Sequence, residues 1–152
     1  MADLFNHDFQ EFIELLNKEG VEYILVGGYA VILHGYIRST ADMDVWVNKT
    51  AVNYEKLRKA YDLFGAPIFP KEQFLGDQFD VWGIGVEPNR IEVLNNLKGV
   101  EFAEAFALCK TFIQNEVEVR YIHLNHLIKA KEAAGRFKDK DDIEQLNKRN
   151  RL

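Results

Sequence analysis

The sequence predicts one α/β domain of the α+β type, in which a mixed β-sheet is flanked by helices. Three observations lead to this fold class: amphipathic stretches at helical spacing, short β-branched and aromatic runs, and two pairs of such runs joined by polar turns. The 152 residues, 47% hydrophobic and 28% charged, suit a single core. We expect residues 1–152 to form one domain, with a core over about 8–122 and a C-terminal helical segment over about 124–150.

The first part of the chain predicts a helix, a strand and a short helix in turn. Asp8 is suited to cap a helix that Gly20 ends, because small polar residues cap helices and glycine terminates them. The apolar positions of this helix recur at helical spacing: Phe9, Phe12, Ile13, Leu15 and Leu16. A strand is expected at Glu22 to Val26, and Gly27-Gly28 separates it from a short helix over Tyr29 to His34.

The rest of the chain predicts a further strand, two hairpins and three helices. The strands are expected at Asp42–Val47, Phe79–Val86, Arg90–Asn95, Thr111–Ile113 and Val117–Ile122, and the last four pair as two hairpins. A helix should begin after Thr50 and end at Gly65. Two C-terminal helices are expected at Asn125–Ala134 and Lys138–Arg149, with Gly135 between them.

Composition excludes several classes of protein. The net charge of −5 argues against non-specific binding to duplex nucleic acid, although residues 129–152 carry 8 basic and 5 acidic side chains. No apolar run reaches the roughly 18 residues of a membrane span, and the N-terminus lacks a secretion pattern. We therefore expect a cytoplasmic protein with no membrane partner. Cys109, the one cysteine, lies in an apolar run and is expected to be buried rather than nucleophilic.

Two aspartates, Asp42 and Asp44, are the candidate metal ligands. On a strand their side chains project to the same face, where two negative charges repel unless a cation lies between them. Mg²⁺ suits this position because it takes carboxylate oxygens and keeps sites for water and phosphate. A two-metal site calls for a third carboxylate. Glu92, in the run Ile91-Glu92-Val93-Leu94, is the candidate, and Asp80 on the paired strand is the rival.

The glycine pair Gly27-Gly28 is the second candidate feature. A helix that begins at such a pair offers backbone N–H groups to phosphate and lets the backbone approach the ligand closely. Taken alone, Gly-Gly is usually a turn, and Asp-x-Asp is usually two solvated strand residues. The combination of the two patterns indicates that a phosphate-bearing ligand binds together with a metal ion.

The run from Val26 to Gly35, continuing through Arg38 to Asp44, resembles the glycine-pair and aspartate-pair motif of the DNA polymerase β-like nucleotidyltransferase superfamily. Within that superfamily the chain is most similar to small proteins related to the AbiE type II toxin. Two further stretches, 90–102 and 131–142, add to the resemblance, which covers most of the chain from Val21 to Leu146.

The resemblance implies the nucleotidyltransferase fold and an Mg²⁺-dependent enzyme, with Mn²⁺ as an alternative metal. Such an enzyme transfers a nucleoside monophosphate from a nucleoside triphosphate such as ATP to a hydroxyl acceptor. In this reading Gly27 and Gly28 hold phosphates, while Asp42, Asp44 and the third carboxylate bind metal. The superfamily commonly has Gly-Ser and a third aspartate, so Gly28 and Glu92 depart from its usual pattern. If Glu92 does not reach the metal, nucleotide binding can survive without efficient catalysis.

Further polar side chains are candidates for phosphate contacts: Arg38, Thr40, Lys131 and Arg136. Arg38 and Thr40 precede the aspartates at alternate positions, so both could face the same cleft, and a surface arginine with a turn hydroxyl is the equally favoured alternative. Asp139 and Asp142 could orient Lys131 and Arg136, and simple helical ion pairs are the alternative account.

The histidines and tryptophans favour structural roles. His34 is expected to pack or to cap a helix, and His123 and His126 lack the further ligands of a zinc site. Trp46 and Trp82 fall in strands, where core packing is the default.

Two hypotheses of different classes follow from these features. The first is a nucleotidyltransferase whose acceptor is a small molecule, an RNA or a protein. The second is a nucleotide-binding or toxin–antitoxin interaction module that keeps the fold without efficient catalysis. A nucleoside triphosphate is the expected ligand in both. A tRNA or protein acceptor is implied only by analogy with toxin relatives, and the candidate protein partners are an antitoxin or a second copy of the chain.

Overall fold

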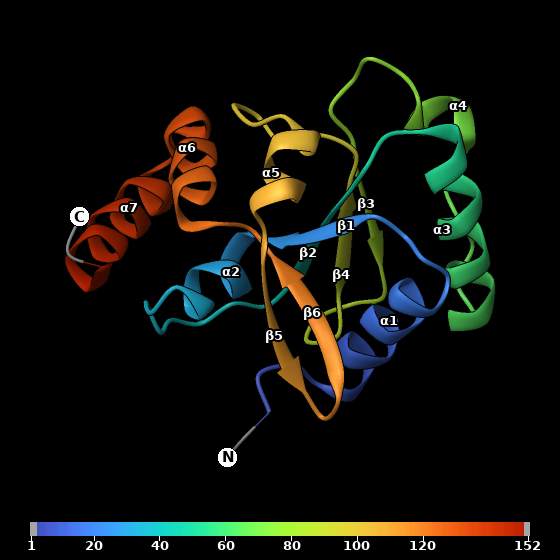
Figure 1. The fold of residues 1–152 in the computed structure, drawn as a ribbon, viewed down its shortest axis with the longest axis horizontal. Coiled ribbons are helices and arrows are strands. Elements are labelled where there is room, and N and C mark those ends of the chain that lie inside the picture. Colours follow the sequence, from blue (N-terminus) through green and yellow to red (C-terminus); the bar gives the residue numbers. More distant parts are fainter. Residues whose placement is uncertain (1–2, 151–152) are drawn as a thin grey trace.

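A computed structural model describes residues 3–150 and shows a mixed sheet flanked by helices, as predicted (Figure 1). Its helices are α1 (His7–Lys18), α2 (Gly27–Leu33), α3 (Ala51–Phe64), α4 (Lys71–Phe74), α5 (Phe102–Leu108), α6 (Leu124–Ala134) and α7 (Phe137–Asn150). Its strands are β1 (Tyr23–Val26), β2 (Met43–Val47), β3 (Val81–Ile84), β4 (Ile91–Leu94), β5 (Lys110–Gln114) and β6 (Val117–Tyr121).

The strands form one sheet in the order β3-β4-β2-β1-β6-β5. The two predicted hairpins, β3 with β4 and β5 with β6, are antiparallel, and β1 pairs antiparallel with β2. Two pairings join strands that are distant in the sequence, and both are parallel: β2 pairs with β4, and β1 pairs with β6. The register of the parallel β2–β4 pair places Asp44 directly beside Glu92.

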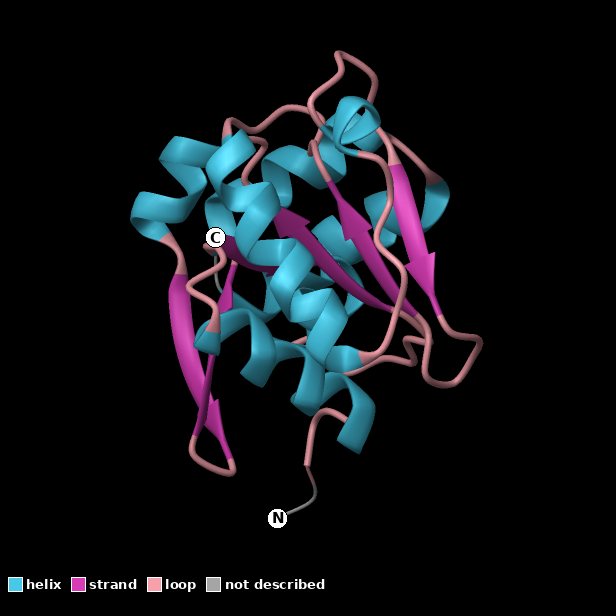
Figure 2. Cartoon of the chain, turned by 90° about the vertical axis from the view of Figure 1, so that its right-hand side faces the viewer, coloured by secondary structure: helices cyan, strands magenta, loops and turns pink. Residues whose placement is uncertain are grey.

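Side chains along the central strands alternate between two apolar cores, as the period of a strand requires. Tyr23 and Leu25 of β1 belong to a core that includes buried side chains of α1 and α3. Ile24 and Val26 belong to a second core, which includes buried side chains of α5, α6 and α7. Figure 1 shows α6 and α7 on the opposite side of the molecule from α3, and Figure 2 shows helices in front of the strands.

The helix ends follow mostly from single residues. Thr50 accepts a hydrogen bond from the backbone N–H of Asn53 and caps α3, and Gly65 ends that helix in the left-handed conformation, as predicted. The predicted cap at Asp8 is wrong, because the side chain of Asn6 accepts the bond from the N–H of Phe9 and Asp8 lies in the first turn. An acidic residue there is still favoured by the helix dipole.

Two short helices, α4 and α5, were not predicted from the sequence. α4 follows Pro70, and α5 includes the apolar stretch before Cys109. Cys109 itself is half-buried, and burial raises the pKa of its thiol, which disfavours the nucleophilic thiolate. Among residues 3–150, no helix is both long and apolar enough to cross a membrane.

Candidate active site

Three carboxylates converge on the sheet face that carries the second core. Asp44 lies two positions before Trp46 on β2, and Glu92 lies two positions before Leu94 on β4, so all four side chains share that face. Asp42 immediately precedes β2 and interacts with Glu92 electrostatically. The parallel pairing of β2 with β4 therefore brings together acidic residues that are about fifty positions apart in the sequence.

The negative charges of Asp42 and Asp44 have few hydrogen bonds or positive side chains beside them in the protein. Oδ1 of each is buried and has no hydrogen-bond partner. Burial, followed by the negative charges of Glu92 and Asp42, raises the pKa of Asp44 to about 7. Burial and then the charge of Glu92 also raise the pKa of Asp42 above its ordinary value. A site built only of oxygen ligands, with unsatisfied lone pairs and excess negative charge, fits a hard divalent cation such as Mg²⁺.

Without divalent ions, the protein is expected to lose stability as the pH rises from about 4 to about 7. The folded chain holds the Asp44 proton with a pKa of about 7, against an ordinary value of 3.8, so it binds more protons than the unfolded chain in this window. Thermal melting in a chelator at several pH values tests this. Asp44→Asn should remove this part of the pH dependence, and an unchanged slope in that variant would contradict the assignment.

Glu92 has a positive partner that the sequence analysis missed. Nε of Arg90 lies 3.2 Å from Oε1 of Glu92, and the Arg90 guanidinium lies across Gly83 of β3. Arg90 precedes Glu92 by two positions, so the same-face spacing used for the aspartates could have found it. The rival carboxylate Asp80 stands elsewhere. Its backbone N–H donates to Asn95 beyond the other end of β4, and it lines neither of the two cavities beside Glu92.

The glycine pair begins α2, whose N-cap residue, Val26, makes no side-chain capping bond. The first N–H groups of a helix have no partner within the helix, so they are suited to an anionic ligand. Gly27 has a φ of +69°, and a Cβ on it would collide with the Asp44 carboxylate. A Cβ on Gly28 would collide with Thr40 and lie 3.4 Å from Nη1 of Arg38. Both glycines therefore allow the backbone to approach the site.

Gly27→Ala is expected to lower affinity for Mg²⁺-ATP at least tenfold, because the new methyl group displaces the Asp44 carboxylate. The left-handed backbone adds a cost of about 1–2 kcal/mol in stability. Gly65→Ala is the matched control: Gly65 also has a positive φ, of +89°, but has no atom within 4 Å of the added Cβ. Calorimetric titration of both variants measures their nucleotide affinity, and urea unfolding measures their stability. Together they separate the collision with Asp44 from the backbone strain that both variants share. Equal nucleotide affinities would refute the steric argument.

The three carboxylates open onto a polar cavity of about 320 Å³. Apart from Asp80, every residue predicted for the site lines it: Gly27, Gly28, Arg38, Thr40, Asp42, Asp44, Glu92, Lys131 and Arg136. Lys138 of α7 lines it as well and acts on Asp44 by its positive charge, a contribution that the sequence analysis did not assign to it. The cavity thus combines carboxylates with cations, the two kinds of group that a metal-bound triphosphate requires.

An ion-pair network holds the cations in place. Lys131, only 6% exposed, lies 3.2 Å from Oδ1 of Asp139 and 3.0 Å from Oδ2 of Asp142. Arg38 donates two hydrogen bonds to the carboxylate of Asp142, of 2.9 and 3.0 Å. Arg136 binds Asp139 through its Nε at 2.6 Å. Burial tends to raise the pKa of Asp139, but hydrogen bonds from Arg136 and Lys131 outweigh it and leave that pKa below its ordinary value. Asp139 is therefore an anionic anchor for Lys131 and Arg136.

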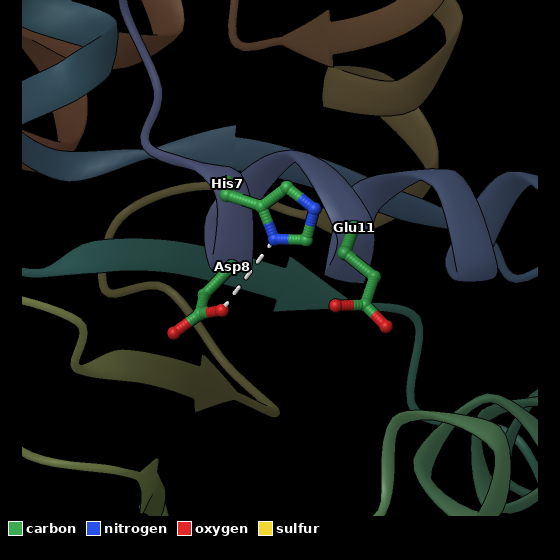
Figure 3. Close-up of side chains that lie close together, drawn as sticks. All are labelled: His7, Asp8 and Glu11. Atoms are coloured by element: carbon green, nitrogen blue, oxygen red, sulfur yellow. Dashed lines mark ion pairs between the residues drawn. The ribbon is translucent and has the colours of Figure 1, made fainter.

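A tighter acidic group lies at the start of α1. Among residues 3–150, only His7, Asp8 and Glu11 place three possible metal-ligand atoms all within 4.8 Å of one another (Figure 3). Nδ1 of His7 lies 3.8 Å from Oδ1 of Asp8, and the side chain of His7 is 88% exposed. All three come from one helix turn at the surface, so ordinary helix geometry accounts for the group.

His34 and His123 make hydrogen bonds of a structural kind. Nε2 of His34 lies 2.7 Å from the carbonyl oxygen of Ile122, and burial lowers the pKa of this histidine. His123 caps α6 by accepting a hydrogen bond from the N–H of Asn125. The packing or capping role expected for His34 agrees with this geometry.

The mixed sheet, the glycine pair at a strand end and the strand carboxylates define a protein of the nucleotidyltransferase class. The chain belongs to the family described as "Nucleotidyltransferase of unknown function (DUF6036)", whose model matches residues 4–152. It is also similar in structure to a candidate nucleotidyltransferase from Thermotoga maritima, with 12% identity and a TM-score of 0.60 over 92% of this chain and 91% of that chain. At that identity the similarity concerns the fold. A search of curated proteins finds no match.

Proposed function

We propose that this chain is an Mg²⁺-dependent enzyme that transfers a nucleoside monophosphate from a nucleoside triphosphate, such as ATP, to a hydroxyl acceptor. The observation that carries the proposal is the pair of buried, unpartnered oxygens on Asp42 and Asp44, which open onto a cavity also lined by a glycine pair and by cations. Family membership supports the same class of reaction. α6 and α7 are part of this site, which supports one functional unit rather than a core with a separate tail.

Asp42, Asp44 and Glu92 are the residues that would hold the metal. The side chain of Glu92 interacts with both aspartates, so the three carboxylates form one group. Three carboxylates suit a two-metal site, in which the paired ions share their ligands. Bound Mg²⁺ would neutralise phosphate charge and polarise the α-phosphate. Mn²⁺ accepts the same oxygen ligands.

The remaining residues position the triphosphate. The N–H groups at Gly27 and Gly28, in the first turn of α2, are suited to phosphate oxygens, and Arg136 and Lys138 add positive charge at the same cavity. The acceptor oxygen forms a bond to the α-phosphorus, while the bond from that phosphorus to the bridging oxygen breaks. Pyrophosphate leaves with the bonding electrons, and the hydroxyl proton passes to a carboxylate of the site. Glu92 is suited to accept that proton because the β2–β4 register places it beside Asp44 and it lines the cavity.

The experiment is to incubate the full chain with a cell extract, Mg²⁺ and each nucleoside triphosphate labelled at the α- or γ-phosphate. Label from the α-position should appear in an acceptor, and label from the γ-position should not. Glu92→Gln should reduce the labelling at least 100-fold, whereas Glu104→Gln, at an exposed residue of α5, should not.

The binding-module hypothesis makes the opposite prediction. If Mg²⁺-ATP binds but no acceptor gains α-label, or if Glu92→Gln labels as well as the wild type, the chain binds nucleotide without the proposed transfer. The identity of the labelled molecule would also test the AbiE relation, because that relation favours a tRNA or protein acceptor.

A further inference from the structure

A second cavity, of about 240 Å³, adjoins the carboxylates and is lined mainly by aliphatic side chains. These side chains come from the sheet, from the loop after β4 and from α6: Val26, Val81, Leu94, Leu97, Leu127 and Ala130. At about 30 Å³ per water molecule, the cavity has room for about eight waters, or a compact organic group of similar volume. Small-molecule sites commonly combine such an apolar wall with a few convergent polar groups.

The apolar cavity and the polar cavity share the carboxylates that line one side of each. Asp44 and Glu92 line both of them, whereas Gly28, Arg38 and Thr40 line the polar cavity alone. A ligand seated among the leucines would therefore have one end beside the carboxylates. That is the position that a hydroxyl acceptor must occupy if the triphosphate lies in the polar cavity.

A nucleobase does not suit the apolar cavity. Its polar edges would need hydrogen-bond partners, since an unpaired polar group buried in an apolar site is costly. The other charged groups there, Lys131, Arg136 and Asp139, are already paired with one another. The described residues that line the cavity include no aromatic side chain on which a base could stack. The residues that line the apolar cavity instead suit a ligand with an apolar body and a single polar end.

We propose that the apolar cavity is the acceptor pocket and that it takes a small alcohol or phenol with a compact apolar body, its hydroxyl directed at Asp44 and Glu92. This assignment rests on the proposed nucleotidyl transfer and specifies the acceptor class for it. The volume of the apolar cavity, about 240 Å³, suits one compact organic group that carries the hydroxyl.

The pocket can be tested without nucleotide, by saturation-transfer NMR on the full chain with 4-methylphenol and adenosine as probes. The phenol should receive saturation and adenosine should not. Ala134→Leu should lower the phenol affinity at least tenfold, because Ala134 lines the apolar cavity and not the polar one, and is exposed enough to carry a larger side chain. Ala51→Leu, at the exposed first residue of α3, is the matched control and should bind the phenol like the wild type.

Each outcome decides the assignment. Saturation of adenosine, displaced by Ala134→Leu, would make the cavity a base site and overturn the proposal. Absence of phenol binding, or equal binding by both leucine variants, would overturn it as well. Failure of the proposed function looks different: the phenol would bind and Ala134→Leu would block it, while no nucleoside triphosphate gave α-label. Circular dichroism melting of Ala134→Leu shows whether the variant is folded.

Discussion

Asp44→Asn is expected to reduce Mg²⁺-dependent nucleotide transfer by at least about 10³-fold and to raise the melting temperature of the metal-free protein. Loss of the charge removes a metal ligand, and metal ions contribute several kcal/mol of charge stabilisation in such reactions. The same substitution relieves the repulsion among Asp42, Asp44 and Glu92, and leaves a neutral side chain where burial penalises a charged one. Activity and stability should therefore move in opposite directions.

The measurement is α-label transfer together with calorimetric melting at pH 8, with and without Mg²⁺. Mg²⁺ should raise the melting temperature of the wild type and leave that of Asp44→Asn nearly unchanged, because only the wild type binds the ion tightly. Asp77→Asn, at an exposed position, serves as the control for loss of one negative charge. Full activity in Asp44→Asn, or a melting temperature lowered by the substitution, would contradict the role given to this residue.

Lys131→Met is expected to destabilise the protein by about 3 kcal/mol, because it leaves two buried aspartates short of a positive partner. Asp139 and Asp142 are 0% and 1% exposed, so water cannot replace the lost ammonium group. Arg136 still contacts Asp139, and Arg38 still contacts Asp142. The loss in the free energy of unfolding should therefore be at the lower end of the range for a broken buried ion pair. For a chain of this length the melting temperature should fall by about 9 °C.

Lys148→Met provides the contrast for this prediction. Lys148 makes one ion pair with Glu144, 3.2 Å apart, and both side chains are more than 60% exposed. Exposed pairs of this kind contribute little, so its urea midpoint should stay that of the wild type. If both methionine variants unfold at the same urea concentration, the buried network is not a source of stability.

The sequence was most informative where a local rule determines the outcome. The Thr50 cap and the Gly65 end of α3 follow from side-chain and backbone chemistry within a few residues, and both were predicted. The two hairpins also follow from adjacent runs joined by short turns. Asn6 replaced Asp8 as a cap because either residue type can cap, and only the path of the chain into α1 decides between them.

Long-range pairing was beyond local rules. Spacing within one strand predicts that Asp42 and Asp44 share a face, but the parallel register that sets Asp44 beside Glu92 depends on the whole sheet. The same holds for Arg38 and Asp142, which meet across 104 positions of sequence. Asp80 and Glu92 could be told apart only when the structure placed one beside the carboxylates and the other beside Asn95.

The parallel pairing of β2 with β4 has a consequence for the order of folding. Hairpins can close early because their strands are neighbours in sequence, whereas β2 and β4 are separated by α3, α4 and β3. Glu92 therefore joins Asp42 and Asp44 only after this long loop has closed. The complete set of three carboxylates is absent before that closure, so high-affinity metal uptake during refolding should follow the pairing of β2 with β4.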